Sequence, residues 1–293
     1  MNQPIRDLIN QDVIALYDDF THTHLDRRLF MERLSKLVGA TAAAAMLPLL
    51  RSNYALAQQV PANDARLAIG TVSYPGSSGE MKGYLARPAG DAKLPGVIVI
   101  HENRGLTPHI QDVTRRAGLA GFVALAPDLF ASVGGTPADE DKAMAAYAQL
   151  QAPVALADAL KTLAYLKSRP DVTGKIGVVG FCWGGGMVNQ LAVSAPDLTA
   201  GSAFYGVAPP LDKVANIKAA LILNYAGLDD RVNATRAGYE EALKKAGVSY
   251  TAYTYEGVNH AFHNDTNAAR YNAEAAKLAW QRTIDFFNAR LKG

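Results

Sequence analysis

The sequence predicts an α/β protein with a mostly parallel sheet that helices cover on both faces. Continuous Val, Ile and Leu runs recur along the chain, as at residues 96–101 and 219–227, and segments with helical spacing separate them. Strands that are apolar on both sides must be buried on both faces, as happens when crossover helices connect parallel strands. A composition of 49% hydrophobic and 19% charged residues fits a globular protein.

The expected strands and helices follow in order beyond residue 66. Two strands, at 67–74 and 81–87, flank the turn-rich sequence PGSSGE and predict an antiparallel hairpin at a sheet edge. Apolar runs predict the other strands at 96–101, 122–128, 175–181, 200–206, 219–227 and 250–256. Amphipathic spacing predicts helices at 109–120, 139–150, 155–169, 186–195, 239–247 and 271–291. Residues 67–293 are therefore predicted to form a single catalytic domain. Its active site is expected at the carboxyl ends of the strands.

Residues 1–57 have the three-part pattern of a signal peptide. Charged residues, among them Arg27 and Arg28, precede an apolar stretch at 37–50, and Ala55-Leu56-Ala57 follows. Paired arginines followed by x-Phe are similar to the twin-arginine signal, which uses its own export machinery to move folded proteins out of the cytoplasm. We therefore predict a signal peptide at residues 1–57, export to the periplasm, and a polar linker at 58–66. An N-terminal helix docked on the domain, or an uncleaved anchor, also fits this pattern.

Charge and cysteine content narrow the classes of function. The net charge is only +2, and residues 58–293 contain no Lys- or Arg-rich run, which argues against a nucleic-acid partner. The single cysteine excludes an intramolecular disulfide and a cysteine-based zinc site. We expect no cofactor. A lone cysteine with His and Asp elsewhere is instead typical of a thiol enzyme.

That cysteine, Cys182, lies in the sequence GFCWGGG directly after the strand-like run KIGVV. The frame is that of the Gly-x-Ser-x-Gly nucleophile elbow, with cysteine in place of serine. A sharp strand-to-helix turn needs residues without a Cβ beside the nucleophile, and the helix start favours a thiolate and a developing oxyanion. The alternative is a buried structural cysteine beside a glycine-rich packing contact.

Two more residues follow strands in the order that α/β-hydrolases use, which is nucleophile, acid, histidine. Asp229 lies in NYAGLDDRV and His260 in YEGVNHAFHND. A thiolate needs a base to form it, and the base needs an acid that fixes its tautomer. Asp230 is the alternative acid and His263 the alternative base, and a His-x-x-His metal pair is a further alternative. Asp229 could also be a turn residue or helix cap.

A carboxylate stands in the loop that supplies the second oxyanion-hole donor of this fold. The strand VIVIH ends at His101, and Glu102, Asn103 and Arg104 follow. Glu102 could pair with Arg104 or cap the next helix. Beside a thiol, however, a carboxylate could hold or deprotonate it.

With these residues together, the chain resembles the dienelactone hydrolase (carboxymethylenebutenolidase) family, an α/β-hydrolase family. HENRGL, APDLF, GFCWGGG, AGLDDRV and NHAFHND occur in that family's order, and the resemblance runs from residue 68 to 291. It implies a monomeric hydrolase of small ester or lactone substrates. It also implies a catalytic triad of Cys182, His260 and Asp229. Glu102 would be the partner of the resting thiol, and the backbone N–H groups of Trp183 and Asn103 would form the oxyanion hole.

Two positions depart from the members that cleave dienelactone. Those members hold the substrate's carboxylate with two arginines, and this chain has Ser132 and Asn264 at the corresponding positions. Neither side chain replaces a planar bidentate fork. The sequence therefore predicts retained chemistry and neutral rather than anionic substrates. Two functions of other kinds are also compatible with the sequence: a non-catalytic ligand-binding module of the same fold, and a redox thiol that reacts with peroxide.

Overall fold

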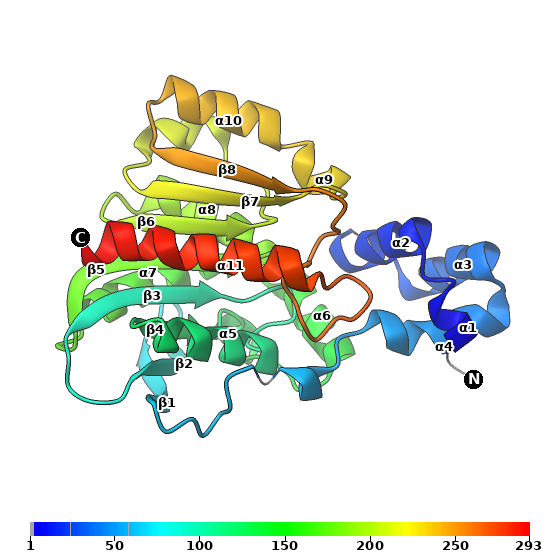
Figure 1. The fold of residues 1–293 in the computed structure, drawn as a ribbon, viewed down its shortest axis with the longest axis horizontal. Helices are drawn as coiled ribbons and strands as arrows, with labels where there is room; N and C mark the ends of the chain where they lie inside the picture. The colour runs from blue at the N-terminus through cyan, green and yellow to red at the C-terminus, as the bar shows by residue number, and fades with distance from the viewer. Residues whose placement is uncertain (1–2, 24, 58) are drawn as a thin grey trace.

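The computed structural model describes residues 3–23, 25–57 and 59–293, so Gln58, the first residue of the predicted linker, lies outside the described residues. The described residues contain one eight-stranded sheet, in the order β1-β2-β4-β3-β5-β6-β7-β8 (Figure 1). Its strands are β1 (Leu67–Pro75), β2 (Glu80–Pro88), β3 (Leu94–Ile100), β4 (Val123–Pro127), β5 (Val172–Phe181), β6 (Ala200–Phe204), β7 (Ala220–Ala226) and β8 (Tyr250–Tyr255).

The sheet has the predicted pattern of directions. β1 pairs antiparallel with β2 at one edge, and β2 pairs antiparallel with β4. All the other neighbours, from β4 to β8, are parallel. The predicted edge hairpin and the mostly parallel sheet are therefore confirmed. The parallel strands all end at one edge, and the loops that leave this edge carry the predicted site residues.

Helices cover both faces of the sheet, as the buried apolar strands require. On one face lie α5 (Pro108–Leu119) and α11 (Ala273–Phe287), which pack on one apolar cluster with β3, β5 and β6. On the other lie α7 (Ala152–Ser168), α8 (Trp183–Ser194) and α10 (Arg236–Lys245), within the larger cluster. Two further helices, α6 (Glu140–Gln149) and α9 (Asp230–Asn233), lie near the carboxyl ends of the strands.

The N-terminal residues fold into helices of their own. These are α1 (Gln3–Arg6), α2 (Gln11–His22), α3 (Arg27–Val38) and α4 (Ala40–Leu50). Val13, Tyr17, Phe30, Leu34 and Met46 contribute to a separate buried apolar cluster between α2, α3 and α4. Figure 1 shows these helices in blue, beside the carboxyl ends of the parallel strands.

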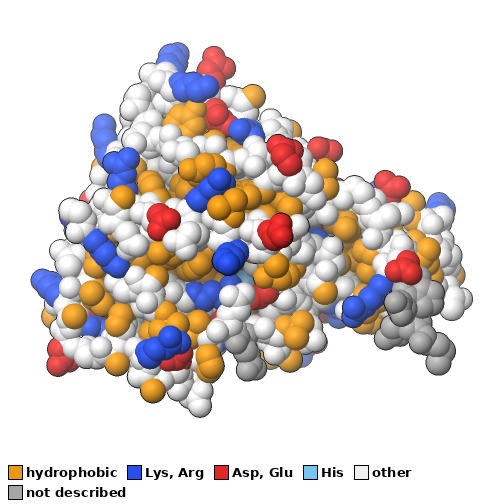
Figure 2. Space-filling view, viewed as in Figure 1, with side chains coloured by type: hydrophobic (Ala, Val, Ile, Leu, Met, Phe, Trp, Pro, Cys, Tyr) orange, Lys and Arg blue, Asp and Glu red, His pale blue; other side chains and the backbone are white. Residues whose placement is uncertain are grey.

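Val60 of the predicted linker is held firmly against the domain. Val60 is buried; its N–H donates to Oδ1 of Asp112 at 2.8 Å, and its carbonyl accepts from Nε of Arg115 at 2.6 Å. No single helix of the described chain is long and apolar enough to cross a membrane. Residues 27–38 and 40–56 meet that criterion only together, with a bend of 115° between them. On the face in Figure 2, acidic and basic side chains are interspersed.

Candidate active site

Cys182 lies in a strained turn between β5 and α8. Its φ of 58° and ψ of −118° are unusual for a residue with a side chain. The turn is also crowded: a Cβ on Gly180 would lie 2.2 Å from the carbonyl oxygen of Gly184. Helix α8 begins at Trp183, directly after Cys182, so its first N–H groups have no partner within the helix. This is the geometry of a nucleophile elbow.

Asp229 and His260 form a buried pair next to this turn. Asp229 follows β7, His260 follows β8, and His260 Nδ1 lies 2.5 Å from Asp229 Oδ2. Asp229 also caps α9 by accepting from the N–H of Val232 at 3.2 Å. The carboxylate therefore holds the imidazole with its proton on Nδ1, and Nε2 is left to act on a neighbouring group.

This pair shifts the pKa values of both groups. Burial on its own lowers the pKa of His260, but the charges of Asp229 and Cys182 outweigh burial and raise that pKa to about 10. Burial raises the pKa of Asp229, and the charge of His260 with its hydrogen bond outweighs that effect and lowers it overall. His260 is therefore a strong proton acceptor in a buried setting.

The alternative acid and the alternative base do not take part in this pair. Asp230 is exposed at the first turn of α9. His263 is buried and stacks on the ring of Phe181, with 4.8 Å between ring centroids. Burial lowers the pKa of His263 well below the ordinary value. Of the two candidate acids and two candidate bases, the structure pairs Asp229 with His260.

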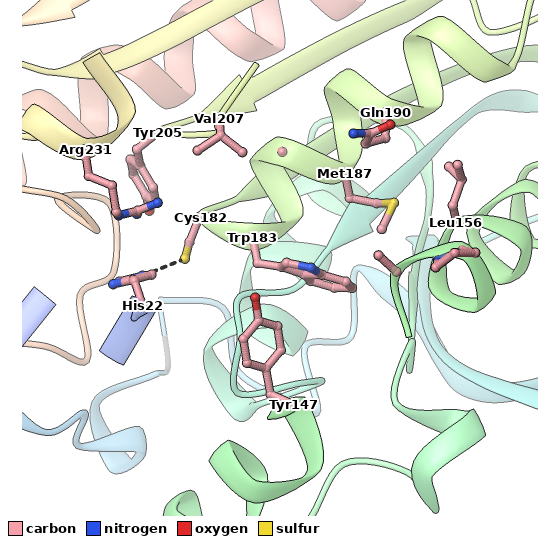
Figure 3. Close-up of a pocket in the computed structure, with 13 residues that line it drawn as sticks. His22, Tyr147, Leu156, Cys182, Trp183, Met187, Gln190, Tyr205, Val207 and Arg231 are labelled. Atoms are coloured by element: carbon pink, nitrogen blue, oxygen red, sulfur yellow. Dashed lines mark hydrogen bonds between the residues drawn. The ribbon is translucent and has the colours of Figure 1, made fainter. Parts of the chain in front are cut away.

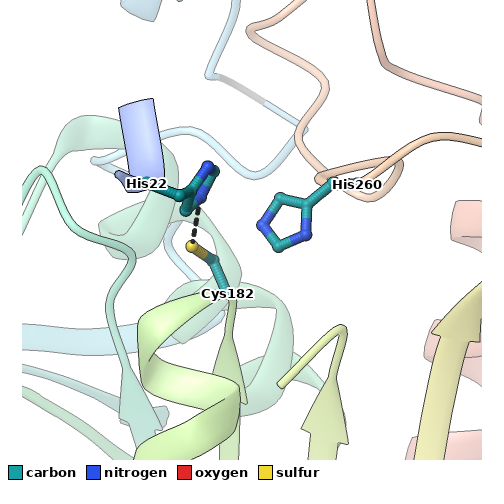
Figure 4. Close-up of side chains that lie close together, drawn as sticks. All are labelled: His22, Cys182 and His260. Atoms are coloured by element: carbon teal, nitrogen blue, oxygen red, sulfur yellow. Dashed lines mark hydrogen bonds between the residues drawn. The ribbon is translucent and has the colours of Figure 1, made fainter. Parts of the chain in front are cut away.

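Sequence reasoning missed a second imidazole at the sulfur. His22, at the end of α2, places Nε2 at 3.1 Å from Sγ of Cys182 (Figures 3 and 4). The nearest ligand-type atoms of His22, Cys182 and His260 all lie within 4.8 Å of one another. His22 belongs to the predicted signal peptide, and nothing in its local sequence resembles a catalytic motif, so no sequence signal points to this contact.

Glu102 lies near the thiol but is engaged by another partner. Its Oε2 accepts a 2.7 Å hydrogen bond from Nδ2 of Asn264. Asn103, the predicted oxyanion-hole residue, is buried, and its Nδ2 donates to the carbonyl of Thr21 at 2.8 Å. Among the described residues, the hydrogen-bond partner of Sγ is His22, in the place where the family resemblance implies Glu102.

Two cavities meet at Cys182. The larger, of about 410 Å³, is open and mostly apolar. Its lining includes Tyr147, Leu156, Trp183, Met187, Val207 and the cationic Arg231 (Figure 3). The smaller is polar, and Glu102, Arg104, Asn264 and Arg270 contribute to its wall together with residues of α2. An apolar acyl or alcohol group therefore fits the larger cavity.

Comparisons with known proteins show which family the chain belongs to. The model of the dienelactone hydrolase family matches residues 81–291. The chain belongs to this family. It is accordingly a hydrolase of carboxylic esters or lactones, with an α/β fold and a mostly parallel sheet.

The similar proteins and solved structures cover three quarters of the chain or more. A "Putative carboxymethylenebutenolidase" of Synechocystis sp. is 34% identical over 240 residues, which are 75% of this chain and 96% of that protein. The crystal structure of a "Putative Dienelactone Hydrolase" from Klebsiella pneumoniae superposes with a TM-score of 0.69 at 29% identity, covering 75% of this chain and 98% of the other. A hyperthermophilic esterase from Pyrobaculum calidifontis shares the fold with a TM-score of 0.64 at 17% identity, and it covers 98% of this chain and 97% of its own.

Proposed function

We propose that the chain hydrolyses a small ester or lactone through a thioacyl-enzyme, with Cys182 as nucleophile, His260 as base and Asp229 as its orienting acid. The observation that carries this proposal is the buried His260–Asp229 pair beside a cysteine at positive φ. A lone structural cysteine needs neither the strained turn nor an oriented imidazole.

Acylation begins when the thiol proton passes to Nε2 of His260. The sulfur attacks the substrate carbonyl carbon, a C–S bond forms, and the carbonyl π electrons become an oxyanion. We assign the stabilisation of this oxyanion to the backbone N–H groups of Trp183 and Asn103. The oxyanion then collapses, the C–O bond to the leaving group breaks, and the alkoxide takes the proton from His260.

Deacylation repeats these steps with water. His260 takes a proton from water, and the hydroxide attacks the thioester carbonyl. Collapse of the second tetrahedral intermediate breaks the C–S bond, and the thiolate recovers the proton from His260. The sum is ester plus water to acid plus alcohol; for a lactone, both groups remain in one product. A thiolate leaves more readily than an alkoxide or an amine anion, so activated esters, lactones and thioesters are better substrates than amides.

The test is stopped-flow hydrolysis of p-nitrophenyl acetate, with intact-mass detection of the acyl adduct. The native protein is expected to give a burst and an adduct, and Cys182→Ala is expected to give neither. Retention of more than a few percent of turnover in Cys182→Ala would overturn the mechanism. A native protein that is folded and reduced but forms no adduct would favour the ligand-binding or redox-thiol function.

We also propose that the protein is exported to the periplasm by the twin-arginine route. Support comes from the paired Arg27 and Arg28, both exposed at the start of α3, and from the apolar stretch beyond them. Changing both arginines to lysine is expected to retain the protein in the cytoplasm, whereas the native chain appears in the periplasmic fraction. An N-terminus near residue 58 in exported protein would show cleavage; equal distribution of both chains would refute this route.

A further inference from the structure

Helix α2 is fitted to the catalytic domain by specific polar contacts. Oδ1 of Asp18 accepts from Nη1 of Arg270 at 2.6 Å, and both side chains are largely buried. The guanidinium of Arg270 also lies 5.2 Å from the centroid of the Tyr17 ring. With the bond from Asn103 to the carbonyl of Thr21, these contacts bring the last turn of α2 to Cys182. These contacts between α2 and the catalytic domain therefore fix the position of His22 beside Cys182.

The surroundings of His22 also determine its tautomer. Nδ1 lies 2.8 Å from the carbonyl oxygen of Asp18, which can only accept, so Nδ1 carries the proton. Burial lowers the pKa of His22 well below the ordinary value, so the ring is neutral. Nε2 then has a lone pair, and the 3.1 Å contact with Sγ is a thiol that donates to an imidazole.

His260 presents a second lone pair to the same sulfur. Its Nδ1 donates to Asp229, so in the neutral ring Nε2 is an acceptor. This Nε2 is buried and has no hydrogen-bond partner among the described residues. The rings of His22 and His260 meet edge to face, with 4.6 Å between centroids (Figure 4). Two imidazole lone pairs thus compete for the hydrogen bond from one thiol, and in this structure the thiol donates to His22.

We propose that His22 holds the thiol proton of Cys182 away from His260, so that helix α2 keeps the nucleophile in a resting state until α2 moves off. This inference rests on the role proposed for Cys182. It assigns His22 a contact with the reacting atom that the catalytic cycle itself does not need. Departure of α2 removes one acceptor, and the proton then passes to the His260–Asp229 pair.

The experiment measures alkylation of the full chain by iodoacetamide at pH 7, followed by intact mass. EDTA is present because two imidazoles and a thiolate also bind zinc. His22→Phe keeps a ring but has no lone pair, and it is expected to raise the alkylation rate about 10-fold, the equivalent of one lost hydrogen bond. His22→Gln retains an acceptor oxygen and is expected to stay near the native rate. Asp19→Asn, exposed on the same helix, is the control and should not change the rate.

A double-mutant cycle separates proton competition from simple shielding. Replacing His260 with Gln is expected to slow alkylation little in the native background and strongly in His22→Phe. Only in the second background does His260 act as the base that takes the thiol proton, and glutamine accepts a hydrogen bond but is not a base. An unchanged or slower rate in His22→Phe overturns the proposal. So does an equal effect of His260→Gln in both backgrounds. If His22→Phe does not fold, as judged by circular dichroism, His22→Ala replaces it.

The same samples distinguish this inference from the proposed function. Treatment with p-nitrophenyl acetate reports the acyl adduct independently of alkylation. Faster alkylation of His22→Phe without any adduct would support the thiol–imidazole contact and refute the acyl-enzyme. An adduct in the native chain and in each His22 variant, with one common alkylation rate, would refute the thiol–imidazole contact and support the acyl-enzyme.

Discussion

Asn264 donates a 2.7 Å hydrogen bond to the carboxylate of Glu102, at the wall of the polar cavity beside Cys182. In the dienelactone-cleaving members that the sequence resembles, an arginine belongs at this position. Here the side-chain amide of Asn264 binds a carboxylate of the protein, that of Glu102, instead of a carboxylate of the substrate. The nearby cations are also engaged, since Arg104 pairs with Glu140 at 3.3 Å and Arg270 with Asp18.

The first prediction is therefore a preference for neutral substrates. We expect kcat/KM for p-nitrophenyl butyrate to exceed that for mono-p-nitrophenyl succinate by at least about 10-fold. Among the described residues that line the polar cavity, both guanidinium groups, those of Arg104 and Arg270, are already paired with carboxylates of the protein. Arg231, in the larger cavity, supplies the control: in Arg231→Gln the ratio should grow only slightly. A native preference for the succinate that disappears in Arg231→Gln would show that Arg231 binds the anion instead.

The second prediction concerns the basic limb of the pH–rate profile. The leaving alkoxide takes its proton from imidazolium, so hydrolysis of an alkyl ester should decline as pH rises through the His260 pKa of about 10. In Asp229→Asn the main raising charge is absent, so this limb should move to lower pH, and kcat should fall. A pH-stat assay of a methyl ester, corrected for spontaneous hydrolysis, measures both. An aryl ester is the control, since p-nitrophenoxide leaves without a proton. A limb at the same pH in Asp229→Asn would contradict the assignment.

The third prediction tests the crowding of the nucleophile elbow. A Cβ on Gly184 would lie 2.5 Å from the carbonyl oxygens of both Ile100 and His101, and backbone cannot move aside easily. We expect Gly184→Ala to lower the free energy of unfolding by about 2–3 kcal/mol. Gly70→Ala, where nothing lies within 4 Å of the added Cβ, should be neutral or slightly stabilising. Urea unfolding of both variants makes the comparison, and equal stabilities would show that the turn relaxes.

The fourth prediction concerns acid stability. Burial raises the pKa of Asp265, but the bonds from His109 and Arg116 outweigh burial and depress it well below its ordinary value of 3.8. A depressed carboxylate pKa stabilises the fold at pH values above 3.8, and this stabilisation is lost as pH falls from 3.8 through the folded value. Urea unfolding of Asp265→Asn should therefore show lower stability at pH 7 and a smaller loss between pH 5 and 3 than the native chain. Parallel curves for the two proteins would exclude Asp265 as a major contributor.

The sequence was sufficient wherever local pattern determines structure. Apolar runs predicted the strands. The glycines around Cys182 predicted a sharp strand-to-helix turn, because a close approach of helix and strand requires residues without a Cβ. Asp229 and His260 were found because each follows a parallel strand, and such strands all end at one edge. The choice over Asp230 and His263 depended on geometry, since adjacent or nearly adjacent residues point in different directions.

The contacts of the N-terminal helices could not be read in the same way. His22 and Cys182 are 160 positions apart, and their contact depends on Asp18, Thr21, Arg270 and Asn103 together. No local spacing encodes such an arrangement. Glu102 illustrates the same difficulty, because its partner Asn264 is 162 positions away. A motif identifies which chemistry is present at a strand end, and tertiary packing decides which neighbour each group contacts.

The connection between residues 50–53 and the loop after His260 has a consequence for synthesis. The carbonyl of Leu50 accepts from Nδ2 of Asn267, and the N–H of Asn53 donates to the carbonyl of Thr266. The first residue of each pair leaves the ribosome more than 200 residues before its partner. These contacts therefore close only after nearly all of the sheet has been made, and contacts so distant along the chain form slowly. The active-site loop is completed last, when the earliest-synthesised helices dock on it.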